Sequence, residues 1–218
     1  MKKFINLYTI LGASFLGLFI LLIILLNFDK SIIVDGGKEV GLSHINNWVS
    51  YKENKNIDLL TDVFFYTSFS ILVFEAILGL IQLIKEKSLF KVDKEIIAFG
   101  VASALALAVW LFFDHVFKLN YRPLNPEECS FPSTHAFLVT FFTLSFHGFV
   151  CLKSSKNLYK YLSLFISVMF ISFVTIGRVA AGKHYITDVC GGLFIGLAFY
   201  FMLFGIIKAL NNKEEIEE

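Results

Sequence analysis

Six long apolar runs dominate the sequence and decide what the chain can fold into. They extend over about Phe4–Phe28, Leu59–Ile84, Ile96–Phe117, Ala136–Leu152, Leu162–Ile176 and Ile186–Ile207. A helix needs about 20 predominantly apolar residues to cross a bilayer, and most of these runs reach or approach that length. Backbone polar groups in hydrocarbon must be hydrogen-bonded within their own segment, which favours helices over open sheets. We therefore expect an all-α fold, a polytopic membrane bundle of six transmembrane helices.

The composition agrees with this interpretation and excludes other classes. Hydrophobic residues make up 56% of the 218 residues and charged residues 17%, whereas soluble domains usually carry about 25% charged residues. A soluble globular domain and a disordered chain are therefore excluded. The formal net charge of +1 gives no broad positive field for nucleic acid. Because no internal repeat or second domain is apparent, residues 1–218 are expected to form one membrane domain.

The first apolar run is expected to be a retained membrane helix. Its length of about 25 residues exceeds the apolar core of about 7–15 residues that is typical of a secretory signal. The residues that follow, Asn27 to Lys30, do not resemble a small-residue cleavage site.

Lysine-rich connections between the runs predict the orientation. The second-to-third and fourth-to-fifth connections contain Lys85, Lys87, Lys91, Lys94, Lys153, Lys156 and Lys160. Because short cytoplasmic loops are enriched in Lys and Arg, both connections, both termini and the tail 208–218 are expected in the cytoplasm. The loop 29–58 is then extracytoplasmic, and the stretch around Trp48 is either an interfacial helix or irregular. We expect a multi-pass protein of the cytoplasmic (inner) membrane.

Polar and ionisable residues gather where three runs meet the predicted outer side. They are Asp114, His115, Lys118, Arg122, Ser133, Thr134, His135, Arg178, Lys183, His184 and Asp188. Such groups are costly near the membrane interior and indicate function by default. Snorkelling towards the interface accounts for an isolated lysine, but not for two arginines together with two histidines.

The spacing of the first polar group suggests a shared helix face. His115, Lys118 and Arg122 follow the i, i+3, i+7 pattern, which places side chains on one side of a helix. Pro123 would end or bend that helix.

The second and third groups suggest a phosphate site and a histidine nucleophile. Ser133 and Thr134 follow a proline and precede an apolar run, which is typical of a helix start. Free N–H groups at a helix start bind phosphate. His184 and Asp188 stand at i and i+4, so the carboxylate can hold one imidazole nitrogen and leave the other free to attack.

These residue types together suit phosphoryl transfer. Arginine and lysine side chains neutralise phosphoryl oxygens. One histidine can attack phosphorus while a second protonates the leaving oxygen. The sequence lacks a carboxylate cluster for Mg²⁺, and arginines beside the histidines would repel a cation. We therefore expect neither a metal nor a cofactor.

The three groups resemble the type 2 phosphatidic acid phosphatase superfamily, whose pattern is Lys-x6-Arg-Pro, then Pro-Ser-Gly-His, then Ser-Arg-x5-His-x3-Asp. This chain has Arg122 and Pro123, then Pro132, Ser133, Thr134 and His135, then Gly177, Arg178, His184 and Asp188 with the same internal spacing. The motifs cover residues 114–188, and the six-span layout extends the resemblance over most of the chain.

The resemblance implies a role for each matching residue. His184 would be the nucleophile that forms a phosphohistidine, Asp188 would orient it, and His135 would be the general acid. Arg122, Arg178 and Ser133 would bind the phosphoryl group together with backbone N–H groups near Thr134. The family requires no metal.

Four departures from the family pattern bear on phosphate binding. His115 stands where the family has Lys, and Lys118, His115 or neither residue takes that role. Thr134 stands in place of Gly and Gly177 in place of Ser, which removes one hydroxyl donor. The segment between Pro123 and Pro132 is short and contains Glu127 and Glu128, which either disfavour highly anionic substrates or are simply solvated.

The expected function is an integral membrane phosphatase with its site facing the periplasm or exterior. Its substrate would be a lipid phosphate monoester or pyrophosphate: an isoprenyl pyrophosphate, phosphatidylglycerol phosphate, phosphatidic acid or a lipid A phosphate. The alternatives are a lipid-to-lipid phosphotransferase with the same residues and a non-catalytic phosphate-binding membrane protein. Besides substrate and membrane lipids, no nucleic acid and no obligatory protein partner are expected.

Overall fold

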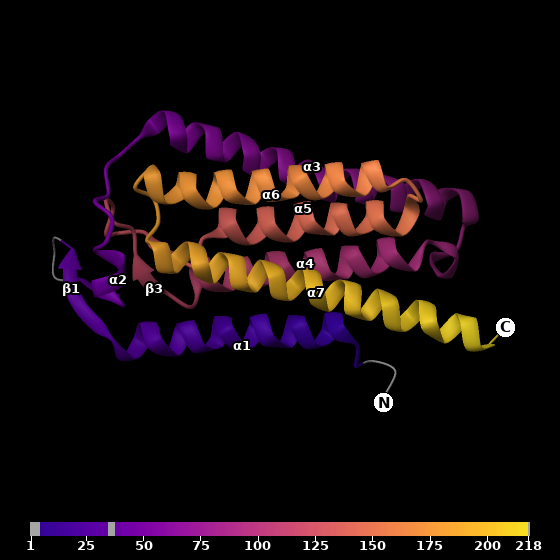
Figure 1. Cartoon of the computed structure of the whole chain (residues 1–218), viewed down its shortest axis with the longest axis horizontal. Coiled ribbons are helices and arrows are strands. Elements are labelled where there is room, and N and C mark those ends of the chain that lie inside the picture. Colours follow the sequence, from indigo (N-terminus) through magenta and orange to yellow (C-terminus); the bar gives the residue numbers. More distant parts are fainter. Residues whose placement is uncertain (1–4, 35–37, 218) are drawn as a thin grey trace.

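Six long helices form a bundle in the computed structural model, which describes residues 5–34 and 38–217 (Figure 1). They are α1 (Leu7–Phe28), α3 (Lys55–Glu86), α4 (Lys94–His115), α5 (Thr134–Lys153), α6 (Asn157–Ala180) and α7 (Ile186–Glu217). In the described part of the chain, six helices are long and apolar enough to cross a membrane. The prediction of six apolar helices is therefore confirmed.

The short elements lie at one end of the bundle, with one exception. At that end are the antiparallel hairpin of β1 (Lys30–Val34) and β2 (Lys38–Gly41), the single turn α2 (Ser43–Asn46), and the antiparallel pair β3 (Leu119–Tyr121) and β4 (Cys129–Phe131). The 3₁₀ turn η2 (Leu89–Lys91) belongs to the α3–α4 connection at the opposite end.

The stretch considered as an interfacial helix forms the end of β2, the single turn α2 and a loop. Val40 and Leu42 are buried inside the protein, and Trp48 is 77% exposed. The backbone N–H of Gly41 donates a 3.0 Å hydrogen bond to Oδ1 of Asn120 on β3. This segment therefore covers the end of the bundle with Val40 and Leu42 turned inward and Trp48 turned outward.

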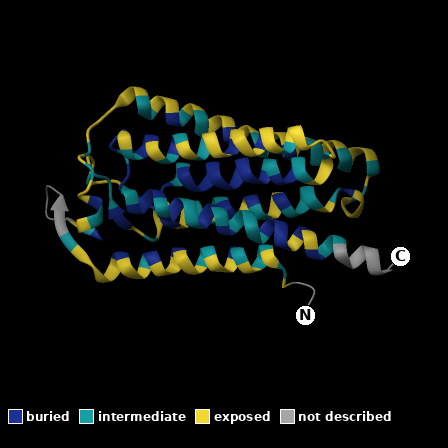
Figure 2. Cartoon of the chain, in the orientation of Figure 1, coloured by how far each residue is buried: buried dark blue, intermediate teal, exposed yellow. Residues whose placement is uncertain are grey.

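Helix α5 runs through the middle of the bundle and supplies much of the core. Phe137, Leu138, Phe141 and Phe142 are almost completely buried. Helices α3, α4, α6 and α7 pack against α5, and the outer helices carry exposed apolar residues (Figure 2). A helix that is apolar all round is typical of a buried position. Because exposed apolar faces suit contact with lipid, the burial pattern agrees with a membrane bundle.

Two glycines bring α7 directly against α5 near the polar end. A Cβ atom on Gly192 would lie 2.5 Å from the carbonyl oxygen of Ser133, and one on Gly196 would lie 2.7 Å from that of Phe137. Gly192 and Gly196 form a small-xxx-small pair, which allows close helix packing. It fixes the start of α5 relative to the start of α7, where the predicted site residues lie.

Candidate active site

His184 lies in the turn between α6 and α7 and is 4% exposed. Its Nδ1 lies 3.0 Å from the carbonyl oxygen of Ser130. A carbonyl oxygen only accepts hydrogen bonds, so the contact assigns the proton to Nδ1 and the lone pair to Nε2. Burial lowers the pKa of His184 below its ordinary value. The geometry therefore favours a neutral imidazole with a free Nε2, as a nucleophile requires.

Asp188 is fully buried beside His184, but it is not the direct partner of the ring. Its Oδ2 lies 3.8 Å from Nδ1 of His184, beyond hydrogen-bond range. The carboxylate instead accepts bonds from the Tyr185 backbone N–H (2.9 Å) and from Nδ2 of Asn120 (3.1 Å). The expected direct contact fails because α7 begins at Ile186, so His184 and Asp188 do not stand at i and i+4 within one helix.

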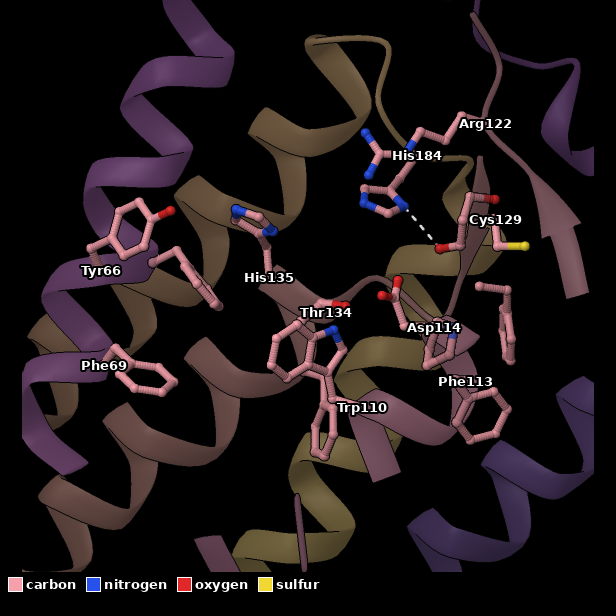
Figure 3. A pocket seen from close by; sticks show the side chains of 15 residues that line it. Tyr66, Phe69, Trp110, Phe113, Asp114, Arg122, Cys129, Thr134, His135 and His184 are labelled. Atoms are coloured by element: carbon pink, nitrogen blue, oxygen red, sulfur yellow. Dashed lines mark hydrogen bonds between the residues drawn. The ribbon is translucent and has the colours of Figure 1, made fainter. Parts of the chain in front are cut away.

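His135 occupies the first turn of α5, which begins at Thr134 after the N-cap residue Ser133. The Ser133 backbone N–H donates to the Asp188 carbonyl oxygen (2.9 Å), which joins this turn to the start of α7. Nε2 of His135 lies 2.9 Å from Oδ1 of Asp62 on α3, and the imidazole packs on the ring of Phe65. The two predicted catalytic histidines thus line the same cavity (Figure 3).

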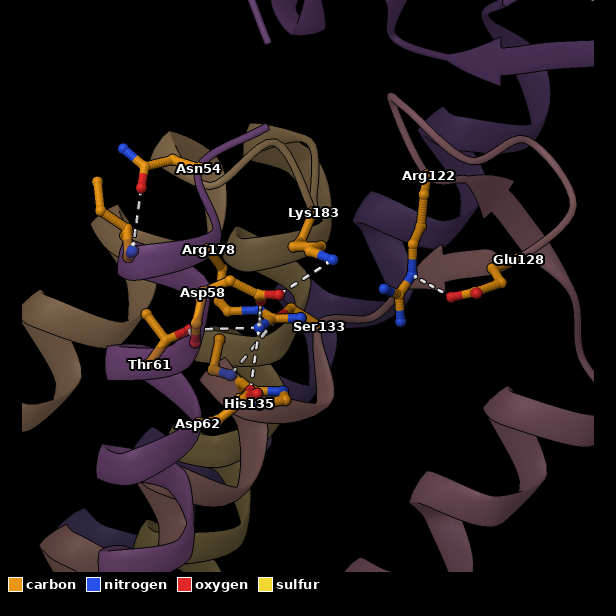
Figure 4. A network of polar contacts seen from close by, with 12 residues as sticks. Asn54, Asp58, Thr61, Asp62, Arg122, Glu128, Ser133, His135, Arg178 and Lys183 are labelled. Carbon is orange, nitrogen blue, oxygen red and sulfur yellow. Dashed lines mark hydrogen bonds and ion pairs between the residues drawn. The ribbon is translucent and has the colours of Figure 1, made fainter. Parts of the chain in front are cut away.

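Arg178, 3% exposed at the end of α6, is held by residues of α3. Its Nη1 lies 2.7 Å from Oδ1 of Asp58, and the Asp58 Oδ2 lies 3.0 Å from Nζ of Lys183 (Figure 4). Nη1 also donates to Oγ1 of Thr61 (3.2 Å) and lies 3.4 Å from Oδ1 of Asp62. Two acidic residues of α3 therefore fix the cation that is predicted to bind phosphate.

Thr61 gives a physical reason for one departure from the family pattern. A Cβ atom on Gly177 would lie 2.5 Å from Cγ2 of Thr61, so a serine there requires Thr61 to move. The Thr61 hydroxyl is the group that contacts Arg178. A threonine of α3 thus fills the space beside Gly177.

Arg122 follows β3 and is held by the short segment before β4. Its Nε lies 3.0 Å from Oε2 of Glu128, and its backbone N–H donates to the Glu128 carbonyl oxygen (3.0 Å). Glu128 is therefore paired with a site arginine instead of being simply solvated. This ion pair also offsets part of the positive charge that Arg122 brings to the site.

His115 and Lys118 do not share a helix face with Arg122, and that prediction was wrong. Helix α4 ends at His115, and the chain becomes extended in β3, where Asn120 adopts a φ of 55°. Both candidate side chains are exposed. His115 lies 3.6 Å from Asp114, and Lys118 borders a separate polar cavity beside Lys30 and Glu39.

A cavity of about 430 Å³ joins the polar site to an aromatic wall. Its polar lining includes Arg122, Thr134, His135 and His184. Its aromatic lining comes largely from α3 and α4: Phe65, Tyr66, Phe69, Trp110 and Phe113 (Figure 3). One end of the cavity therefore suits a phosphoryl group, and the wall beside it suits an apolar chain.

The sequence interpretation missed Asp58, Asp62, Thr61 and Asn120. Asp58 and Asp62 stand four residues apart at the start of an apolar run, which places both on one helix face. That spacing was the available signal. Asn120 carries no comparable signal, since its contacts with Gly41 and Asp188 join segments far apart in the sequence.

The fold and the site define a helical integral membrane protein with two histidines and two arginines gathered at one end of the bundle. The PAP2 superfamily model matches residues 97–212, more than half of the chain. The chain belongs to the PAP2 superfamily, as its motifs predicted, and this membership supports a membrane phosphatase.

A solved structure shares the fold. The PAP2-type phosphatidylglycerolphosphate phosphatase from Bacillus subtilis, described as a transmembrane protein, aligns with a TM-score of 0.56 at 18% sequence identity. The alignment covers 90% of this chain and 96% of that protein. A comparison with curated protein sequences gave no match.

Proposed function

We propose that this protein hydrolyses a lipid phosphate monoester or pyrophosphate through a phosphohistidine on His184. The observation that carries the proposal is the hydrogen bond from Nδ1 of His184 to Ser130, which leaves Nε2 as the lone-pair nitrogen in the cavity that His135 and Arg122 also line. A nucleophile, a proton donor and a phosphate-binding cation are the parts that metal-independent phosphoryl transfer needs.

In the first step, Nε2 of His184 attacks phosphorus while Arg122 and Arg178 bind the phosphoryl oxygens. The bond from phosphorus to the leaving oxygen breaks as the N–P bond forms, and His135 gives its proton to that oxygen. The phosphorylated ring carries positive charge, which the nearby carboxylate of Asp188 stabilises.

In the second step, water attacks phosphorus and His135 accepts the proton that this water loses. The N–P bond breaks, inorganic phosphate leaves, and His184 returns to its neutral form. His135 thus acts first as an acid and then as a base, because the proton that it gives up in the first step is restored in the second.

The aromatic wall supports an amphiphilic substrate. The wall comes from α3 and α4, and both helices carry exposed apolar residues that suit lipid contact. A substrate with its phosphate at the histidines can lay its chain along this wall. An isoprenyl pyrophosphate, phosphatidylglycerol phosphate, phosphatidic acid and a lipid A phosphate all have this layout, and the aligned B. subtilis phosphatase makes phosphatidylglycerol phosphate a natural first substrate to assay.

The positions of the lysine-rich connections support a site that faces the periplasm or exterior. The α3–α4 and α5–α6 connections lie at the end of the bundle opposite the site (Figure 1). At this end, Lys153 at the end of α5 and Asp93 in the α3–α4 connection form a 3.2 Å ion pair. Because lysine-rich loops favour the cytoplasm, we place this end and both termini there and the whole chain in the inner membrane as one domain.

The test is release of inorganic phosphate by purified protein from each lipid phosphate in the presence of EDTA. We expect release from at least one lipid, none from His184→Ala, and unchanged release when an acceptor lipid is added. Loss of activity in EDTA would contradict the metal-independent mechanism, and a phosphorylated acceptor lipid would identify a phosphotransferase. If the His184→Ala variant were as active as the wild-type protein, the assignment of His184 as the nucleophile would be wrong.

A further inference from the structure

We propose that Asp62 is a positioning residue that fixes which nitrogen of His135 exchanges the proton with the substrate. This inference rests on the proposed function, because it concerns the general acid of that reaction. Asp62 lies outside the three sequence motifs, on a helix that precedes all of them.

The contact joins two helices at the mouth of the site. Oδ1 of Asp62 on α3 lies 2.9 Å from Nε2 of His135 on α5, with the two side chains 39% and 19% exposed. Phe65, three residues further along α3, packs on the imidazole with 4.4 Å between ring centroids. Helix α3 thus holds the ring by one edge and one face, which restricts its rotation.

The chemistry of the two groups determines the proton positions. An ionised carboxylate only accepts hydrogen bonds, so the proton between Asp62 and His135 belongs to Nε2. The nitrogen left for the substrate is Nδ1. In the first step, the His135 imidazolium gives its Nδ1 proton to the leaving oxygen and becomes neutral with its Nε2 proton still directed at Asp62. In the second step, Nδ1 takes the proton from the attacking water.

Asp62 also connects the general acid to the phosphate-binding arginine. The same Oδ1 lies 3.4 Å from Nη1 of Arg178, whose closer partner is Asp58 at 2.7 Å. Asp58 directs its second oxygen to Lys183. Asp58 therefore pairs with both cations, Arg178 and Lys183, whereas Asp62 makes its shorter contact with His135.

Two model substrates separate this role from a structural one. An alkyl phosphate needs its leaving oxygen protonated, whereas an alkyl-substituted nitrophenyl phosphate of similar length releases a stable phenolate. We compare kcat/KM, because it covers the reaction only up to the first irreversible step. The Asp62→Asn variant removes the carboxylate charge that stabilises the His135 imidazolium and holds its Nε2 proton, so the ring is a weaker proton donor at Nδ1.

For Asp62→Asn we expect kcat/KM to fall by about 10²-fold or more for the alkyl phosphate and to stay within a few-fold for the nitrophenyl phosphate. Asp58→Asn is the matched control, an equal loss of charge on the same helix, and should lower kcat/KM for both substrates by a similar factor. Equal losses for both substrates with Asp62→Asn, or no loss with either, would overturn the proposal. If wild-type protein hydrolyses neither substrate, the proposed function itself fails and this inference fails with it.

A spectroscopic measurement on the wild-type protein keeps the inference falsifiable if the variant does not fold. Nitrogen-15 NMR of the histidine side chains in lipid nanodiscs, with His135→Gln to assign the signal, should show neutral His135 protonated at Nε2. A neutral ring protonated at Nδ1 would contradict the proposal irrespective of activity.

Discussion

The carbonyl oxygen of Ser130 lies 3.0 Å from Nδ1 of His184, nearer than the 3.8 Å that separates this nitrogen from the Asp188 carboxylate. A main-chain group therefore sets the tautomer of the proposed nucleophile. The carboxylate supplies charge and holds the surrounding backbone. We therefore expect replacement of His184 and replacement of Asp188 to have different effects on activity.

Replacing Asp188 with asparagine should weaken the enzyme without abolishing activity. Ser130 still holds Nδ1, so the variant loses chiefly the negative charge beside the phosphorylated ring. We expect kcat to fall by about 10- to 100-fold, equivalent to about 1.4–2.7 kcal/mol, in a phosphate-release assay. A variant as inactive as His184→Ala, at unchanged thermal stability, would show that the carboxylate sets the tautomer after all.

His184 should remain neutral at pH values at which an ordinary histidine is protonated. Burial lowers its pKa below the ordinary 6.5, so an NMR titration of the ring should have its midpoint below pH 6.5. The folded protein then binds this proton less tightly than the unfolded chain, and the free energy of unfolding decreases as the pH falls below 6.5. A midpoint at or above 6.5 would contradict the buried, neutral nucleophile.

Arg122 should matter for substrate binding, whereas Lys118 and His115 should not. Arg122 lines the cavity, while the other two side chains are exposed outside it. We expect Arg122→Ala to lower kcat/KM by about 100-fold, the loss of a charged hydrogen bond of about 3 kcal/mol. Lys118→Ala and His115→Ala should stay within a factor of about two. A large rise in KM for either control would place it in the site.

The close approach of α7 to α5 should be sensitive to a single methyl group. A Cβ atom on Gly192 would lie 2.5 Å from the Ser133 carbonyl oxygen, whereas one on Gly17 of α1 meets nothing within 4 Å. Gly192→Ala should therefore destabilise the protein by about 1–3 kcal/mol and lower activity by displacing Ser133. Gly17→Ala is the control. A thermal denaturation midpoint for Gly192→Ala as high as for Gly17→Ala would contradict the packing described.

The sequence predicted the six helices because a bilayer imposes length and hydrophobicity on each span, and both can be read directly. It also predicted that His135, Arg122 and His184 meet, since their motifs are ordered and lie at one end of the predicted spans. Local conformation was harder. The prediction that His115, Lys118 and Arg122 share one face required α4 to continue beyond His115. Instead the helix ends there, β3 pairs with β4, and Lys118 is turned away from the site.

The contacts of α3 with the site could not be predicted. Asp58 and Asp62 appeared to be the polar edge of an apolar run, and nothing local connects them to Arg178 or His135 more than 70 residues away. Such pairs depend on how helices pack, which neither periodicity nor motif spacing encodes. The Ser130 carbonyl was missed for a related reason, because every residue has a carbonyl and only the fold selects this one.

The most direct test of the central claim is to trap the phosphorylated intermediate. Purified protein is mixed with a lipid phosphate labelled with radioactive phosphorus, quenched in alkali, and digested for peptide mass spectrometry. We predict label that is stable in alkali and labile in acid on the peptide containing His184, and no label in His184→Ala. Turnover without label on His184, or label that persists in His184→Ala, would contradict the account.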